Sequence, residues 1–430
     1  MTQRIEDNGR SGVSPSGARV VVVGAGFAGG SLLRNLPPIL RRQGETLLVA
    51  REERYTFIPL IHEVAAGRVH PESVLTPVSP DGDAAPFGTL RAEATGVDLE
   101  NRVLHTSSVP VRYRYLILAP GSVAAPPPKS LSGYFQTFGS LEDALRLRSA
   151  LDEAWRGAMR RKKRPGEVTV AVVGGGATGV ELAAEIAALF KYLEKRAVRE
   201  LAEEPRVVLF EATDRLMSWL DQYFHKVALE ELLRLGVEVR LNTPVTAADE
   251  GGVVAKGGRL PAATRVWATG VRSNPLVRGL PGEHDDVGRV RVDGHLTLPD
   301  HPEVYVLGDN ALYEDGRHGP LPATASVAVQ HGSYAARDLS LRVREAPVER
   351  RRPFRFFNRG YAVSLGPEYG VADPLGVRIR GRAAQALYRS IFLYYMKSTR
   401  GRILTGADWA MERTLGRVGF ASQAAERTGR

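Results

Sequence analysis

Two glycine-rich segments of this chain each follow an apolar run and precede a run with helical spacing. Residues 24–29 read G-A-G-F-A-G after the apolar residues 20–23, and residues 174–179 read G-G-G-A-T-G after the apolar residues 170–173. In such a pattern the first glycine permits a tight turn, the second lets a pyrophosphate approach the backbone, and the third lets the helix pack on the strand. The amides at the start of the helix then face the phosphates. Two such segments predict two bound dinucleotides and electron transfer between them.

The composition excludes several classes of chemistry. The 430 residues contain no cysteine, which rules out disulfides, thiolate metal ligands and thiol redox chemistry within them, and we expect no metal site. No run approaches the ~20 apolar residues that a membrane span needs. Residues 1–16 are polar and lack the apolar stretch of a signal peptide, so we expect residues 1–17 to be a disordered tail.

The order of strand and helix patterns predicts an α/β fold with two nested Rossmann-type domains and a C-terminal module. We expect a first dinucleotide-binding domain in two parts, residues 18–140 and 285–349, with a second such domain, residues 141–284, between them. A basic and aromatic module, residues 350–430, follows. We expect strands at residues 19–23, 46–50, 115–118, 206–210, 265–267 and 304–307, a β-meander within 91–118, and helices at 141–159, 180–189 and 323–339.

The two predicted sites differ where the second strand ends, because an acidic residue there binds the ribose. In the second domain this residue is Glu211, which favours NAD(H), since a carboxylate would repel the 2′-phosphate of NADP(H); a solvated strand end is the alternative. In the first domain the place holds Ala50. We expect Glu52 or Glu53 to serve instead and count Arg51 with Glu52 among the cofactor-binding residues.

The net charge of +10 lies entirely in residues 351–430, which hold 15 basic and 5 acidic side chains. This segment contains an aromatic and apolar stripe at helical spacing, formed by Leu387, Tyr388, Ile391, Phe392, Tyr394 and Tyr395 and flanked by Arg382, Arg389, Lys397, Arg400 and Arg402; a second probable helix carries Trp409 and Met411. Such a helix is typical of an anionic membrane surface. The alternatives are a solvated arginine-rich face, a helix packed on the first domain, or a dimer interface. The basic run at 160–164 is expected to be a solvated helix end.

The motifs occur in an order that resembles the two-dinucleotide-binding flavoprotein reductases. Besides the glycine segments they are A-P-G-S at 119–122, A-T-G-V-R at 268–272 and L-G-D-N at 307–310. More narrowly, residues 57–67, F-I-P-L-I-H-E-V-A-A-G, resemble a stretch of the type II, non-proton-pumping NADH:quinone oxidoreductases. The basic, aromatic tail resembles the membrane-binding module of that family. The resemblance covers about residues 18–415.

The resemblance implies FAD in the first domain and NADH in the second, with hydride passing to the flavin and two electrons then passing to a membrane quinone. It implies a peripheral respiratory enzyme at the cytoplasmic face of the cell membrane, and a homodimer is left open. The FAD site would include Gly24, Gly26, Gly29, Ala119, Gly121 and Asp309. The NADH site would include Gly174, Gly176, Gly179 and Glu211. Further expected cofactor-binding residues are Phe27, Ala28, Thr178, Gly270 and Ala325.

Three residues are expected to take part in the reaction. Glu181 would face the junction of nicotinamide and flavin; a carboxylate favoured by the helix dipole is the alternative. The family's quinone-site pattern A-Q-x-A-x-Q-[QE]-G reads A-S-V-A-V-Q-H-G at 325–332, so this chain departs from it at Ser326 and His331. We expect Gln330 and His331 to line the quinone site, with His331 donating a proton or a hydrogen bond. A buried structural histidine is the alternative.

Two other functions fit the same motifs. A soluble NADH-dependent reductase of an iron–sulfur protein would use both dinucleotide sites but would not need an apolar tail. A non-enzymatic, redox-sensing flavoprotein would use its basic tail on an anionic surface. We expect no nucleic acid partner, because the tail matches no nucleic-acid-binding motif.

Overall fold

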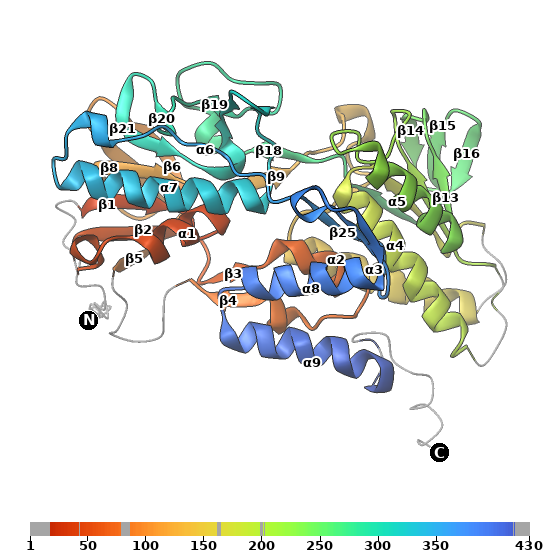
Figure 1. Ribbon diagram of the computed structural model, residues 1–430. Helices are drawn as coiled ribbons and strands as arrows, with labels where there is room; N and C mark the ends of the chain where they lie inside the picture. The colour runs from red at the N-terminus through yellow and green to blue at the C-terminus, as the bar shows by residue number, and fades with distance from the viewer. Residues whose placement is uncertain are drawn as a thin grey trace, which may run out of the picture. The chain divides into compact units, whose positions relative to one another are not determined.

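The computed structural model describes residues 18–42, 44–78, 87–160, 165–197, 201, 203–415 and 417 (Figure 1). The expected disordered tail, residues 1–17, and residues 161–164 of the basic run lie outside this description. Contacts divide the chain into two compact units. The first unit is built from residues 1–55, 77–123 and 272–357, and the second from residues 56–76, 124–271 and 358–430.

The core of the first unit is a largely parallel sheet with the strand order β20-β21-β8-β1-β2-β5, and β6 and β7 extend it beside β8. The strands are β1 (Ala18–Val23), β2 (Thr46–Ala50), β5 (Gly88–Arg91), β6 (Ala94–Asp98), β7 (Val103–Thr106), β8 (Val111–Leu118), β20 (Thr297–Leu298) and β21 (His301–Val306). Strand β1 lies between β2 and β8 and is buried on both faces, which is why it reads as a continuous apolar run. The expected meander is confirmed, since β6, β7 and β8 pair antiparallel in chain order.

Two helices of the first unit, α1 (Phe27–Asn35) and α7 (Ala325–Val343), lie side by side (Figure 1). A Cβ at Gly332 on α7 would come within 2.1 Å of the carbonyl oxygen of Ala28, so this close approach requires glycine. Ser31 on α1 also donates a hydrogen bond to the carbonyl oxygen of Val329 over 2.9 Å. The helix that follows the first glycine segment is thereby held by a late part of the chain.

The second unit contains a parallel sheet with the strand order β10-β17-β11-β12-β13. Its strands are β10 (Gln136–Thr137), β11 (Thr169–Val173), β12 (Arg206–Phe210), β13 (Val237–Arg240) and β17 (Thr264–Trp267), and its helices are α3 (Leu141–Arg160), α4 (Ala177–Glu194) and α5 (Gln222–Arg234). An antiparallel sheet of β14 (Val245–Asp249), β15 (Gly252–Ala255) and β16 (Gly258–Pro261) belongs to the same unit. Each glycine segment thus follows a buried strand and begins a helix, as predicted.

The second unit also gathers two stretches that are far apart in the sequence. Residues 56–76 form η2 (Ile58–Leu60), α2 (Ile61–Ala65) and η3 (Pro71–Val74). Residues from 358 onward form an antiparallel sheet and two helices, namely β25 (Ala362–Ser364), β26 (Gly370–Ala372), β27 (Ile379–Gly381), α8 (Arg382–Tyr395) and α9 (Thr399–Leu415). The domain limits expected from the sequence differ from this division, most clearly in placing residues 56–76 with the first domain; those limits stay predictions.

The remaining elements are short. They are η1 (Pro38–Arg41), β3 (Arg54–Thr56), β4 (Leu75–Pro77), β9 (Ser122–Ala124), η4 (Lys129–Leu131), β18 (Val271–Ser273), α6 (Pro275–Arg278), β19 (Val290–Arg291), η5 (Gly308–Asn310), β22 (Ala311–Leu312), β23 (Glu314–Asp315), β24 (Gly319–Pro320), η6 (Val348–Arg350) and η7 (Pro374–Gly376). Within the part of the chain that is described, none of the helices has the length and apolar character that crossing a bilayer requires.

Candidate functional site

The first glycine turn connects β1 to α1. Gly24 has φ +90°, and a Cβ there would lie 2.2 Å from the carbonyl oxygen of Ala119 at the end of β8. A Cβ at Gly29 would lie 2.0 Å from the carbonyl oxygen of Gly24. A Cβ at Gly26 would meet only the ring of Tyr55, at 3.8 Å, and Gly26 has an ordinary extended backbone with φ −63°. The outer glycines are therefore required by packing, whereas the space above Gly26 is left free by the protein.

The second glycine turn, between β11 and α4, repeats this geometry. Gly174 has φ +116°, and a Cβ there would lie 2.4 Å from the carbonyl oxygen of Ala268 at the end of β17. A Cβ at Gly179 would lie 1.9 Å from the carbonyl oxygen of Gly174. A Cβ at Gly176 would meet no atom within 4 Å. Both turns fit a pyrophosphate, because each leaves a side-chain-sized space at its middle glycine, at the start of a helix.

The expected ribose-binding positions differ between the two units. In the second, the carboxylate of Glu211 accepts hydrogen bonds from the backbone N–H of Gly175 at 2.6 Å and of Thr213 at 2.8 Å, so it is held at the glycine turn. In the first, Arg51 and Glu52 follow β2, are exposed, and pair with each other over 3.0 Å. The structure therefore places Glu211 at the second glycine turn, while Arg51 and Glu52 lie exposed after β2 and pair with each other.

Other predicted cofactor-binding residues of the first unit gather around Asp309 in η5. The hydroxyl of Ser122 donates to the Asp309 carboxylate over 2.7 Å, and the amide of Asn310 donates to the carbonyl oxygen of Gly121 over 3.1 Å. Burial raises the pKa of Asp309, although the hydrogen bond from Ser122 opposes this shift. Gly121 has φ +79° and no atom near its would-be Cβ. A carboxylate and an open glycine thus lie at the ends of β21 and β8, where parallel sheets bind ligands.

The remaining predicted cofactor-binding residues are Phe27, Ala28, Thr178, Gly270 and Ala325. Phe27 contacts the ring of Tyr55 edge-to-face, with centroids 6.0 Å apart, and Ala28 is buried against α7. Thr178 is exposed on the first turn of α4. Gly270 has φ +114° and accepts a hydrogen bond from the N–H of Ala125. Ala325 begins α7 after Thr324, whose hydroxyl caps that helix.

The predicted quinone-site residues lie on α7 in the first unit. The side-chain amide of Gln330 donates to the carbonyl oxygen of Phe357 at 3.1 Å and accepts from the N–H of Phe357 at 3.0 Å, and it also donates to Ser326 at 3.3 Å. The side chain of Gln330 therefore fastens the segment around Phe357, whose own side chain is 60% exposed.

His331 is completely buried beside Gln330. Its Nδ1 accepts a hydrogen bond from the N–H of Gly308 over 3.1 Å, and its ring packs edge-to-face against Phe354 and Tyr313. Burial lowers the pKa of His331 to about 3. These contacts are those of a neutral structural histidine, the alternative raised from the sequence. The role of His331 in quinone binding stays a prediction, and this geometry speaks against it.

The aromatic stripe of the tail is only partly exposed, which corrects the expectation that the stripe as a whole faces a membrane. Tyr388 is completely buried, and Phe392 packs on Tyr388 and on Phe57, with ring centroids 4.2 and 5.7 Å apart. These residues face inward in the second unit because α8 contacts Phe57 and Pro59. Tyr394 at the end of α8 is 74% exposed, and on α9 the side chain of Ile403 is 66% exposed.

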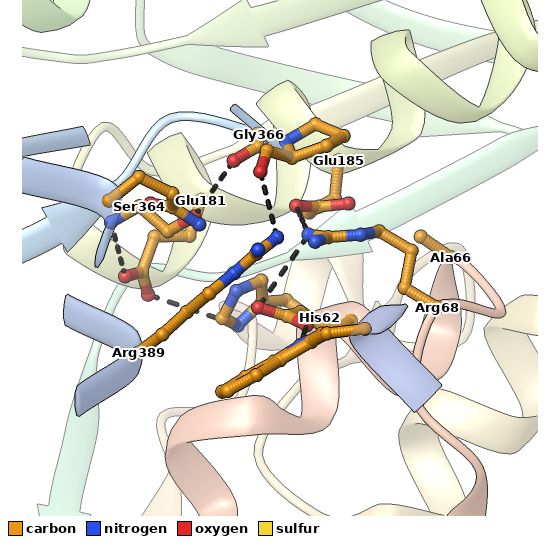
Figure 2. A network of polar contacts seen from close by, with 12 residues as sticks. His62, Ala66, Arg68, Glu181, Glu185, Ser364, Gly366 and Arg389 are labelled. Carbon is orange, nitrogen blue, oxygen red and sulfur yellow. Dashed lines mark hydrogen bonds and ion pairs between the residues drawn. The ribbon is translucent and has the colours of Figure 1, made fainter. Parts of the chain in front are cut away.

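Glu181, on the first turns of α4, lies in a buried polar network (Figure 2). Its Oε1 accepts from the N–H of Ser364 over 3.1 Å, and its Oε2 is 4.0 Å from Nδ1 of His62. Tyr388 also hydrogen-bonds to this carboxylate. Burial raises the pKa of Glu181, and the nearby His62 opposes the shift.

The sequence interpretation did not single out the other members of this network. His62 and Glu63 on α2, Arg68 after it, and Glu185 one turn beyond Glu181 are all buried in the second unit. Two signals could have found them. A His-Glu pair interrupts the apolar run at 57–67, and Glu181 and Glu185 stand four residues apart on the same face of an otherwise apolar helix.

Comparisons with known proteins agree with the fold. The chain is 29% identical over 433 residues to the type II NADH:quinone oxidoreductase Ndh of Mycobacterium tuberculosis, covering 92% of this chain and 88% of that one. It is similar in structure to NDH2 from Plasmodium falciparum in complex with NADH, with a TM-score of 0.83, 17% identity and coverage of 94% and 99%. For the covalent putidaredoxin reductase–putidaredoxin complex the TM-score is 0.64, with 20% identity and coverage of 83% and 81%.

The sequence model of one family matches residues 18–332, which include both glycine turns, Glu211, Asp309 and Gln330. This match spans well over half of the chain. The chain therefore belongs to the pyridine nucleotide-disulphide oxidoreductase family.

Proposed function

We propose that this chain is a type II NADH:quinone oxidoreductase. It binds FAD in the first unit and NADH in the second, and it transfers two electrons from NADH to a membrane quinone without pumping protons. The observation that carries this proposal is the pair of glycine turns, each with an open middle glycine, of which only the second is joined by a carboxylate, Glu211. The similarity to a type II enzyme over 92% of the chain supports the choice of acceptor.

When bound, FAD supplies the redox chemistry, taking a hydride from NADH and giving two electrons to the quinone. The turn at Gly26 and the carboxylate of Asp309 would hold the FAD, and the turn at Gly176 with Glu211 would hold the NADH. Because these 430 residues contain no cysteine, no disulfide within them can accept the electrons. The acceptor is therefore a separate molecule.

Glu181 and Gln330 are our candidates for the residues that serve the reaction. Glu181 can hold a proton more readily than an ordinary glutamate, since burial raises its pKa. Gln330 contributes by fastening the backbone at Phe357 to α7. The roles of Glu181 and Gln330 in the reaction stay predictions.

We infer that the enzyme is peripheral and contacts the cytoplasmic face of the membrane through α9 and the end of α8. One face of α9 is apolar and exposed, with Ile403 66% and Met411 42% exposed, and Arg400 and Arg402 flank it. Tyr394 on α8 is also exposed. An apolar helix face beside arginines suits the interface of an anionic bilayer.

Stopped-flow spectroscopy of the purified flavoprotein tests the activity. NADH should bleach the flavin absorbance, and a soluble quinone should restore it within a turnover. Reoxidation by an iron–sulfur protein but not by any quinone would contradict the proposal and would favour the soluble reductase.

Flotation with anionic liposomes tests the membrane surface. The double variant Ile403→Ser/Met411→Ser should float much less than the unmodified protein, because the apolar contribution is lost. Val377→Ser is the matched control, since Val377 is 62% exposed in the same unit but lies outside both helices. Deleting the tail is a poorer test, because the inner face of α9 is part of a buried network. If the double variant floats as well as the control, the face of α9 is not the membrane contact.

A further inference from the structure

A cluster of buried charges joins α2, α4, α8 and α9 inside the second unit (Figure 2). Its centre is Arg68, whose side chain is completely buried. The guanidinium Nη1 of Arg68 lies 2.5 Å from Oε1 of Glu185 and 3.6 Å from Oε1 of Glu63, and its Nε lies 3.0 Å from Oε2 of Glu412. The buried Arg68 thus forms ion pairs with three carboxylates from three different helices.

Three further contacts join the cluster to α9 and to Arg417 after it. The indole N–H of Trp409 donates to Oε2 of Glu63 over 2.6 Å, and Arg417 lies 3.1 Å from Glu412. Arg389 stacks over the ring of Trp409, with its guanidinium carbon 5.0 Å from the ring centroid. Glu63, Glu412 and their partners are therefore fixed in place.

Among the described residues, six buried atoms of the cluster have no hydrogen-bond partner: Nε2 of His62, Oε1 of Glu63, Oε2 of Glu185, Nη2 of Arg68, and Nε of both Arg389 and Arg417. A ring nitrogen of His62 and one oxygen from each of the two carboxylates lie within 4.8 Å of one another. The other side of the imidazole faces Glu181, with Nδ1 4.0 Å from Oε2. A buried polar atom without a hydrogen-bond partner destabilises the folded state. The unpartnered atoms of this cluster therefore point to a mobile proton or a bound water.

The charges of the cluster favour one protonated carboxyl group. Among the described side chains of the cluster, the carboxyl groups are those of Glu63, Glu181, Glu185 and Glu412, and the guanidinium groups are those of Arg68, Arg389 and Arg417. One protonated carboxyl group would make the cluster neutral, which burial favours. A metal ion between His62, Glu63 and Glu185 is disfavoured, because the guanidinium of Arg68 already lies against Glu185.

We propose that Glu185 stores one proton beside Arg68 and that His62 passes it to Glu181 when the quinone is reduced. The proposal rests on the quinone reductase activity proposed above. Hydride transfer from NADH brings two electrons and one proton, and reduction of a quinone to a quinol takes up two electrons and two protons. One proton per turnover must therefore come from solvent, and the store supplies it.

The proton leaves the carboxyl group of Glu185 and binds one nitrogen of His62, while the other nitrogen of the imidazole releases a proton to Glu181. Glu181 then gives its proton to the reduced quinone and returns to its starting state. The store then takes a proton back from solvent. Separations of about 4 to 5 Å are spanned by one water molecule or by a small rotation of the ring. No electron moves in this relay, and no group of the protein changes its net protonation over a full cycle.

The surroundings favour Glu185 as the place where the proton rests. Burial, opposed by Arg68, raises the pKa of Glu185 to about 7. The groups that act on it are Arg68, Glu63, Arg417 and Glu412, and Arg389 and Tyr388 also face the cluster. By contrast, Arg68 and Arg417 lower the pKa of Glu412 despite its burial, so Glu412 stays ionised. Because the store empties as pH rises past about 7, quinone reduction should slow there.

The variant Glu185→Gln tests the relay by stopped flow at pH 6 to 9. Reduction of the flavin by NADH should stay within about twofold of the unmodified enzyme, while reoxidation by quinone should slow by at least about tenfold and lose its dependence on pH near 7. Glu230→Gln is the control, because Glu230 is an exposed carboxylate of the same unit that pairs with Arg380 outside the cluster. Similar slowing of flavin reduction and of reoxidation in Glu185→Gln would overturn the relay and indicate a structural role.

Infrared spectroscopy tests the store without turnover. The unmodified protein should show the carbonyl band of a protonated carboxyl group that disappears as pH rises through about 7, and Glu185→Gln should lack it. His62→Gln should keep the band yet slow reoxidation. If the unmodified protein shows no such titrating band, the proposal is wrong. If NADH reduces the flavin but no quinone reoxidises it, the proposed function is contradicted instead. The infrared band would still show whether the carboxyl group binds a proton.

Discussion

The two glycine turns have nearly the same backbone but different surroundings. A Cβ added to the outer glycines would lie 2.2 and 2.0 Å from a carbonyl oxygen in the first turn, and 2.4 and 1.9 Å in the second. A Cβ at Gly176 would meet no atom within 4 Å, and one at Gly26 would meet only the ring of Tyr55, at 3.8 Å. The carboxylate of Glu211 accepts a hydrogen bond from Gly175 in the second turn, whereas the first unit has Ala50 at the equivalent strand end. We propose that the shared glycines form the two pyrophosphate sites and that residues outside the pattern select the dinucleotide.

The interiors of the two units differ as well. The first unit buries His331 in neutral form among aromatic rings, while the second buries a network of carboxylates and guanidinium groups around Arg68. A buried neutral group destabilises the fold when it must take up a proton. A buried charged network destabilises the fold when one of its partners is removed. The predictions below test each side of this contrast, beginning with the largest expected effect.

Adding a methyl group to an outer glycine should damage the fold. Gly179→Ala would place a Cβ 1.9 Å from a backbone oxygen that cannot move without opening the turn, so we expect a loss of about 3 kcal/mol or more in the free energy of unfolding. Gly406→Ala on α9 is the control, because its Cβ meets no atom within 4 Å and alanine favours helix. Chemical denaturation of both variants decides the matter, and equal stability would contradict the packing role.

Filling a middle glycine should remove one dinucleotide and spare the fold. Gly26→Val should purify without its FAD, because the side chain occupies the space of the pyrophosphate, with affinity reduced by at least about a hundredfold, or ~2.7 kcal/mol. Gly176→Val should keep its FAD but fail to be reduced by NADH. Flavin absorbance before and after NADH measures both. Full yellow colour in Gly26→Val would show that the first turn does not hold FAD.

The buried imidazole of the first unit predicts a loss of stability in acid. Since burial lowers the pKa of His331 from 6.5 to about 3, the unfolded chain binds a proton first, and the stability from this residue is lost as pH falls below about 6.5. Between pH 6 and pH 4 the loss should be about 2 kcal/mol. In His331→Asn, whose side-chain oxygen can still accept from Gly308, that part of the pH dependence should vanish.

The same variant tests the quinone role of His331. A neutral structural histidine predicts unchanged reoxidation by quinone between pH 6 and pH 8. If His331→Asn instead removes a step near pH 6.5 from the reoxidation rate, the imidazole takes part in the reaction, and the structural interpretation fails.

The smallest expected effect concerns the carboxylate of the second turn. Glu211→Ala should lower the ratio of kcat/KM for NADH over NADPH by about tenfold, or ~1.4 kcal/mol, because the repulsion of a 2′-phosphate is lost. Glu211 also holds Gly175, so the affinity for both nucleotides should fall somewhat. A ratio that does not change would show that Glu211 serves the turn alone.

Sequence patterns predicted the parts of the molecule that depend on local chemistry. The strands around both turns were found to within a few residues, since buried parallel strands read as apolar runs and the glycines mark their ends. The surroundings of His331 and Tyr388 were not predicted, because their burial depends on Phe354 and Phe57, which other elements bring to them. The cluster around Arg68 could not be predicted for the same reason, as its carboxylates come from three separate helices.

The ion pair between the buried Arg68 and α9 should limit which substitutions relatives of this chain accept during evolution. Arg68 and Glu412 are 344 residues apart in the sequence, yet they form an ion pair at 3.0 Å within the second unit. We expect a mutation of either residue alone to leave a charge uncompensated and to destabilise the fold, and we expect paired changes to be tolerated. In an alignment of relatives, positions 63, 68, 185 and 412 should therefore vary together, and hybrid genes that join the early part of one relative to the late part of another should fail where these positions disagree.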